Sequence, residues 1–151
     1  MYVKSLNILL AEDNPDHAEL IVDALKQFNI GNHVFHVKNG EEVLGFLDQK
    51  NGGDRVPDLI LLDLKMPRLD GAETLAHIKA MAPHKRTPVI MLSTSGMNDD
   101  VEKCYALGAN SYVTKPLKFN EFTQKIRELN LYWVLTSEIP GPNMPTSEHR
   151  Y

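Results

Sequence analysis

The sequence has 151 residues, which is enough for one domain with a hydrophobic core and too few for two domains of ordinary size. Its 42% hydrophobic and 24% charged residues are typical of a globular protein, and the net charge of −4 argues against the basic face of a nucleic-acid-binding protein. The single cysteine, Cys104, excludes an internal disulfide and fits a reducing cytoplasm. The apolar run at 6–11 ends at Glu12-Asp13 and is too short for a signal peptide or a membrane span, so we expect a cytoplasmic protein with no membrane contact.

Short apolar runs alternate along the chain with helical patterns. The runs cover residues 8–10, 34–37, 59–62, 89–92 and 111–113. The first, third and fourth are continuously apolar, which is typical of strands buried on both faces of a parallel sheet. The pattern after Asn14-Pro15 predicts the first helix, because asparagine is a good N-cap and proline fits the first helical turn.

The remaining helices are expected at about 41–48, after Gly71, at about 98–107 with an end at Gly108, and from about residue 120. Five strand–helix units in this order predict an α/β fold with a doubly wound parallel sheet. Residues 49–57 are expected to form a loop. Residues 1–135 are expected to form the domain and residues 136–151 a Pro-rich C-terminal tail, with no output domain.

Polar residues follow four of the predicted strands. Right-handed crossovers bring the C-terminal ends of parallel strands to one edge of the sheet, where ligands bind. Three carboxylates at this edge would repel one another without a cation, and their oxygens favour Mg²⁺. An aspartate there can act as a nucleophile and form an aspartyl phosphate. The residues are Glu12, Asp13, Asp63, Ser93, Thr94 and Lys115.

These residues resemble the receiver domain of two-component response regulators. The motif at 61–67, Leu-Leu-Asp-Leu-Lys-Met-Pro, carries Asp63, and Asp70-Gly71 and Lys115-Pro116 follow it. The spacings between Asp63, Ser93 and Lys115 also match the family, and the resemblance covers about residues 6–128. It implies a flavodoxin-like fold, with a five-stranded parallel sheet in the order 2-1-3-4-5 and helices on both faces.

The resemblance implies a phosphoryl site with a metal cofactor. Asp63 would be the phosphoacceptor. Asp13 and Asp63 would bind Mg²⁺, for which Mn²⁺ can substitute, together with the backbone carbonyl of Lys65. Glu12 would act on the metal mainly through water.

The resemblance also implies a switch that responds to phosphorylation. Ser93 and Lys115 would contact the phosphoryl group, and the peptide bond between Lys115 and Pro116 would be cis. Tyr112 would be the aromatic switch residue. Thr94 is a second switch candidate and an alternative hydroxyl to Ser93.

As a receiver, the protein would not be an enzyme in the ordinary sense. It would catalyse its own phosphorylation, lose the phosphoryl group slowly and signal by protein contact. The donor would be a sensor histidine kinase or a histidine-phosphotransfer protein. The long loop at 49–57 and the Tyr132-Trp133 pair are similar to small receivers that partner bacterial phytochromes, so a phytochrome is one candidate for the kinase.

The fifth helix carries an apolar stripe that includes Phe119 and Phe122 and continues to Trp133. We predict an interface at its end, with Phe122, Tyr132 and Trp133 as candidate anchors. A homodimer through the fifth strand and fifth helix is the expected assembly.

The sequence leaves other functions open. Haloacid-dehalogenase-type phosphatases also use an aspartate nucleophile with Mg²⁺, but they carry a second aspartate where this chain has Lys65. The same residues would also suit a phosphorelay intermediate, and a receiver-like module that is inert and acts only by protein contact would share the fold. The six histidines show no paired metal spacing and are expected at the surface or on strands.

Overall fold

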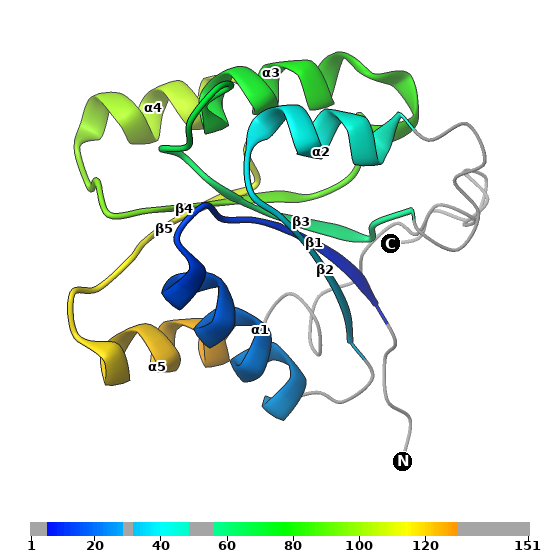
Figure 1. The fold of residues 1–151 in the computed structure, drawn as a ribbon. Helices are drawn as coiled ribbons and strands as arrows, with labels where there is room; N and C mark the ends of the chain where they lie inside the picture. The colour runs from blue at the N-terminus through cyan, green and yellow to red at the C-terminus, as the bar shows by residue number, and fades with distance from the viewer. Residues whose placement is uncertain (1–5, 29–31, 49–55, 130–151) are drawn as a thin grey trace, which may run out of the picture.

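Five parallel strands form the central sheet of the computed structural model, which describes residues 6–28, 32–48 and 56–129 (Figure 1). The strands are β1 (Asn7–Ala11), β2 (His33–Val37), β3 (Leu59–Asp63), β4 (Val89–Ser93) and β5 (Ser111–Thr114). Their order is β2-β1-β3-β4-β5, so the predicted strand order and fold class are confirmed. The predicted tail at 136–151, Tyr132, Trp133 and most of the predicted loop at 49–57 lie outside the described residues.

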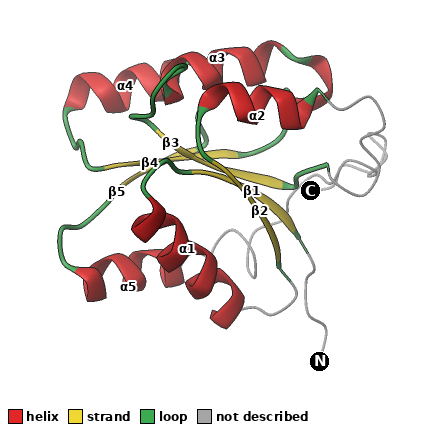
Figure 2. Ribbon diagram, viewed as in Figure 1, coloured by secondary structure: helices red, strands yellow, loops and turns green. Residues whose placement is uncertain are grey.

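Helices cover both faces of this sheet and make a three-layer structure (Figure 2). On one face lie α1 (Pro15–Phe28) and α5 (Phe119–Leu129). On the other face lie α2 (Gly40–Leu47), α3 (Gly71–Ala80) and α4 (Asn98–Ala106). A short 3₁₀ turn, η2 (Ala82–His84), follows α3 and was not predicted. Within the described ranges, no helix is both long and apolar enough to cross a bilayer.

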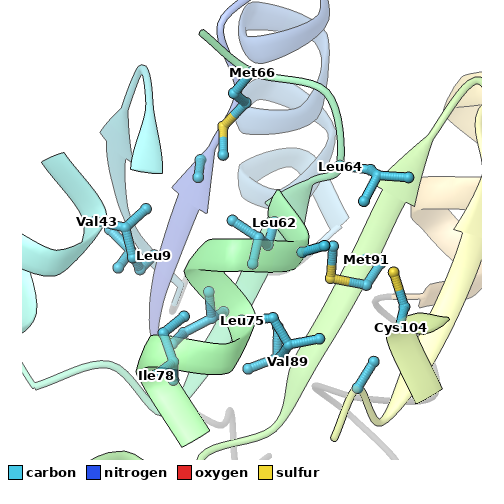
Figure 3. Close-up of a cluster of buried hydrophobic side chains, with 14 of the residues drawn as sticks. Leu9, Val43, Leu62, Leu64, Met66, Leu75, Ile78, Val89, Met91 and Cys104 are labelled. Atoms are coloured by element: carbon cyan, nitrogen blue, oxygen red, sulfur yellow. The ribbon is translucent and has the colours of Figure 1, made fainter. Parts of the chain in front are cut away.

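The strand side chains alternate between two hydrophobic cores, one on each face of the sheet. All five residues of β3 and all five of β4 are buried. Leu9, Leu62 and Met91 face the layer of α2, α3 and α4 (Figure 3). Their neighbours Ile8, Leu61 and Ile90 face α1 and α5. Burial on both faces explains why these strands are continuously apolar in the sequence.

Three helices begin at side-chain caps where the chain leaves the C-terminal edge of the sheet. Asn14, Asn39 and Asp70 each accept a backbone N–H of the first helical turn at 2.9 Å. Such caps typically contribute about 1 kcal/mol each. They fix the starts of α1, α2 and α3, and α1 and α3 are the helices that come next in the chain after Asp13 and Asp63.

Gly71 packs directly against the backbone of the strand that ends in Asp63. A Cβ at Gly71 would lie 2.3 Å from the carbonyl oxygen of Asp63 and 2.6 Å from the Cα of Leu64. Because these are backbone atoms, the strand end itself would have to shift. We expect Gly71→Ala to lower the free energy of unfolding in urea by about 1–3 kcal/mol.

Gly45 provides the matched control for this prediction. It lies exposed within α2, and a Cβ there would have no atom within 4 Å. Gly45→Ala is expected to raise the free energy of unfolding by about 0.5–1 kcal/mol, because alanine is the better helix former. Effects of the same sign for the two variants would contradict the close packing at Gly71.

Candidate functional site

The predicted acidic residues meet at the C-terminal edge of the sheet. Glu12 and Asp13 follow β1, and Asp63 is the last residue of β3. One carboxylate oxygen from each of the three lies within 4.8 Å of the other two. Glu12 and Asp63 are buried, whereas Asp13 is exposed. The structure thus brings together all three acids that the sequence analysis selected.

Lys115 enters the same cluster from the end of β5. Its Nζ donates a hydrogen bond to Glu12 Oε1 and lies 3.5 Å from Asp63 Oδ2. The Lys115 and Glu12 side chains are only 3% and 1% exposed, so this ion pair is shielded from water. The backbone N–H of Lys115 donates to the carbonyl of Ser93 at 2.6 Å, which ties the two strand ends together.

The expected cis bond between Lys115 and Pro116 is not found. This bond is trans, as are all other peptide bonds of the described residues. A trans bond before proline is favoured by about 0.5–1 kcal/mol. Lys115 reaches both carboxylates with the bond in this form.

The cluster holds more negative charge than Lys115 balances. Burial, and then the hydrogen bond and charge of Glu12, raise the pKa of Asp63 to about 8. Burial also acts to raise the pKa of Glu12, but its hydrogen bonds with Asp63 and Lys115 outweigh this and lower that pKa. Without a cation, Asp63 is therefore mainly protonated at neutral pH.

This charge and geometry fit a hard divalent cation. Carboxylate oxygens are the ligands that Mg²⁺ prefers, and it commonly takes one or two from the protein and completes its shell with water and phosphate. Asp13 and Lys65 both line a cavity of about 430 Å³ that opens beside the cluster towards α4. The cavity leaves room for a cation with its water ligands.

The predicted switch residues are linked through Ser95, which the sequence analysis did not select. Ser93 is buried, and its Oγ accepts the backbone N–H of Ser95 at 3.1 Å. The Tyr112 hydroxyl donates to the carbonyl of Ser95 at 2.7 Å. The Ser95 hydroxyl in turn donates to Asp100 of α4 at 2.6 Å. Thr94 is exposed, so Ser93 carries the buried hydroxyl of the two.

One histidine contradicts the expectation that histidines lie at the surface or on strands, and a second makes a contact in the site. His84 is buried beside α2, with Nε2 3.4 Å from the carbonyl oxygen of Leu47, so the prediction is wrong for this residue. His17 of α1 is only partly exposed, and its Nδ1 lies 3.3 Å from Lys115 Nζ. No local sequence signal marks this contact, because the partners are far apart in the chain.

The proposed interface anchor Phe122 also requires correction. Its side chain is 4% exposed and packs in the core between the sheet, α1 and α5, so it offers no surface to a partner. Phe119, one turn earlier in the same stripe, is 74% exposed. The stripe alone does not distinguish the residue that faces the sheet from the one that lies beyond its edge.

The comparisons with known proteins agree on one family. The family model of the response regulator receiver domain matches residues 8–127. The probable methanogenesis regulatory protein FilR2 of Methanothrix harundinacea is 37% identical over 136 residues, which are 89% of this chain and 88% of FilR2. The response regulator Rcp1 of Synechocystis is 35% identical over 136 residues, which are 89% of this chain and 92% of Rcp1.

Solved structures show the same similarity in three dimensions. The crystal structure of Mn²⁺-bound Rcp1 has a TM-score of 0.83 at 34% identity and covers 90% of this chain and 99% of Rcp1. The structure of the phosphorylated cyanobacterial phytochrome response regulator RcpA has a TM-score of 0.85 at 37% identity and covers 93% of this chain and 100% of RcpA. Sequence, fold and family model agree, and the chain belongs to the response regulator receiver domain family.

Proposed function

We propose that this receiver domain is a phosphorylation switch in which Asp63 accepts a phosphoryl group from the phosphohistidine of a sensor kinase or phosphotransfer protein. The observation that supports this role is the position of Asp63. It ends a buried strand beside the ammonium of Lys115 and within the cluster of Glu12 and Asp13. An aspartate nucleophile with a cation partner at a strand end is suited to form an aspartyl phosphate.

The transfer forms one bond and breaks one. A carboxylate oxygen of Asp63 attacks the phosphorus, the phosphorus–nitrogen bond of the donor breaks, and the leaving imidazole takes up a proton from water. Lys115 already lies beside Asp63 and would pair with the incoming phosphoryl oxygens. The Ser93 hydroxyl would donate a hydrogen bond to one of them.

Asp63 must be ionised to attack, and its pKa of about 8 disfavours this at neutral pH. We assign the metal to Asp13, Asp63 and the backbone carbonyl of Lys65, with Mg²⁺ or Mn²⁺ as the cofactor. When bound, the ion supplies positive charge that lowers the pKa of Asp63 and balances the transferred phosphoryl group. The Mn²⁺-bound form of the relative Rcp1 supports this assignment.

The signal would leave the site through the β4–α4 loop. If Ser93 turns its hydroxyl to the phosphoryl group, it releases the N–H of Ser95, whose carbonyl holds Tyr112. The surfaces that change are α4, β5 and α5. Driving a two-state switch from 1:99 to 99:1 takes about 5.5 kcal/mol, which a few charge-assisted hydrogen bonds can supply.

The similarity to Rcp1 and RcpA supports a phytochrome as the sensor kinase, since RcpA is a phytochrome response regulator. The phosphorylated protein would signal by contact with other proteins. One such contact would be a homodimer formed through β5 and α5. Residues 1–135 are the proposed extent of the receiver unit.

Intact-mass spectrometry after incubation with an acyl phosphate tests the proposed function. Wild type is expected to gain one phosphoryl group with Mg²⁺ and none in excess chelator, because without the cation Asp63 is mainly protonated and the charge of the phosphoryl group is not balanced. Asp63→Asn is expected to gain none in either condition. Asp23→Asn, which alters an exposed carboxyl on α1, should behave as wild type. If folded wild type gains nothing with Mg²⁺, the inert interaction module becomes the better description.

A further inference from the structure

His17 lies against the buried ion pair of Lys115 and Glu12, and the proposed transfer does not use it. Its Nδ1 is 3.3 Å from Lys115 Nζ and 3.8 Å from Glu12 Oε1. An ammonium has three N–H donors and no acceptor, so the contact is a hydrogen bond from Lys115 to the Nδ1 lone pair of His17. Lys115 then has two acceptors, Glu12 Oε1 and His17 Nδ1.

His17 is held both through its backbone and through its ring. Its backbone N–H donates to the Asn14 side chain at 3.2 Å, as part of the cap of α1. Its ring meets the ring of Phe122 edge-to-face, with centroids 5.5 Å apart and planes at 71°. Phe122 is buried in α5, the helix that follows the Lys115 loop. Packing of α1 on α5 thus sets where Nδ1 lies relative to Lys115.

A lysine side chain has many rotamers. A single acceptor fixes the distance of the ammonium from that acceptor but leaves the direction of the other N–H bonds free. Glu12 and His17 come from different elements and hold two of the three N–H bonds of Lys115. The third is then free to point towards Asp63, whose Oδ2 lies 3.5 Å away. This is the carboxyl that would receive the phosphoryl group.

We propose that His17 is a positioning residue that directs the Lys115 ammonium towards the phosphoryl group on Asp63. The inference rests on the proposed function of Asp63 as the phosphoacceptor. It predicts a role in the rate of phosphoryl transfer and none in metal affinity, because His17 contacts Lys115 and is not one of the clustered acidic residues.

Three substitutions separate positioning from packing. His17→Phe keeps an aromatic ring against Phe122 and removes the acceptor. His17→Ala removes both. His17→Asn places an amide oxygen near the position of Nδ1 and restores the acceptor without the ring.

Phosphorylation by an acyl phosphate, which needs no kinase docking surface, is the measurement. At saturating Mg²⁺, His17→Phe and His17→Ala are expected to lower the maximal rate constant about 5–10-fold, since small misplacements of a catalytic group are costly. His17→Asn should recover most of the loss. The Mg²⁺ dissociation constant, measured by calorimetry, should change less than about 2-fold in all three variants, because Asp13 and Asp63 are intact.

A wild-type rate constant in His17→Phe would overturn the inference, because only packing would then matter at this position. An equal loss in His17→Asn and His17→Ala would overturn it as well. Failure of the proposed function would be seen differently, because wild type itself would then accept no phosphoryl group. Failure of the inference about His17 would be seen as fast transfer in His17→Phe while wild type is active.

Discussion

Lys115→Met is expected to lower the free energy of unfolding of the metal-free protein by about 3–5 kcal/mol near neutral pH. The substitution removes the ammonium that pairs with buried Glu12 and lies 3.5 Å from Asp63. Methionine fills a similar volume, so the loss comes from the charge that remains and not from a cavity. Urea unfolding in excess chelator measures it, and the loss should shrink in acid, where a proton can replace the ammonium.

Two further variants establish that the buried pair causes this effect. Lys118 lies three residues later in the chain and is exposed. The free energy of unfolding of Lys118→Met should therefore stay within about 0.5 kcal/mol of wild type. Adding Glu12→Gln to Lys115→Met should recover part of the loss, because it removes the lone buried charge. If Lys115→Met costs no more than Lys118→Met, the ion pair does not contribute to stability as the structure indicates.

The elements of this fold could be predicted because their signals are local. A strand buried on both faces is apolar along its length, and the strands Leu59–Asp63 and Val89–Ser93 are buried throughout and apolar up to the polar residue that ends each of them. The start of α1 follows from the Asn14 cap. Parallel strands then bring their C-terminal ends together, so residues directly after the strands meet without any knowledge of side-chain packing.

The contacts that prediction missed depend on how helices lie across the sheet. His17 and Lys115 are 98 residues apart and meet only because α1 packs beside α5. Phe119 and Phe122 share one apolar stripe, yet the sheet covers only the second. Ser95 joins Ser93 to Tyr112 partly through its backbone carbonyl, which any residue would provide. Side-chain type therefore predicted the candidate reacting groups but not the residues that hold them in place.

Asp63 is expected to make the metal-free protein less stable as the pH rises. Its pKa is about 8 in the folded protein against an ordinary value of 3.8. Burial is the first cause of this rise, and the hydrogen bond with Glu12 and the negative charge of Glu12 are the next. Between these values the folded protein keeps a proton that the unfolded chain has released, so the free energy of unfolding falls with rising pH. The fall ends above about pH 8, where both states are ionised. Glu12, whose pKa is lowered from 4.5, titrates below most of this window.

Asp63→Asn places a neutral amide where the protonated acid stands, and it should remove this pH dependence. In excess chelator the variant is expected to be more stable than wild type at about pH 9, with the difference closing as the pH falls towards about pH 4. Urea unfolding across this range measures the effect. Asp23→Asn changes an exposed carboxyl and should follow wild type throughout. A wild-type free energy of unfolding that stays constant over the range would contradict the raised pKa.

Mg²⁺ is expected to narrow this difference in stability. A cation at 100 times its dissociation constant stabilises the folded state by about 2.7 kcal/mol, and wild type should gain this amount. Asp63→Asn has lost one of the three clustered carboxylates and should gain much less. The stability advantage of Asp63→Asn over wild type should then be about 2–3 kcal/mol smaller in Mg²⁺ than in chelator. Equal stabilisation of both proteins by Mg²⁺ would show that the ion binds without Asp63, and the assigned metal ligands would have to be revised.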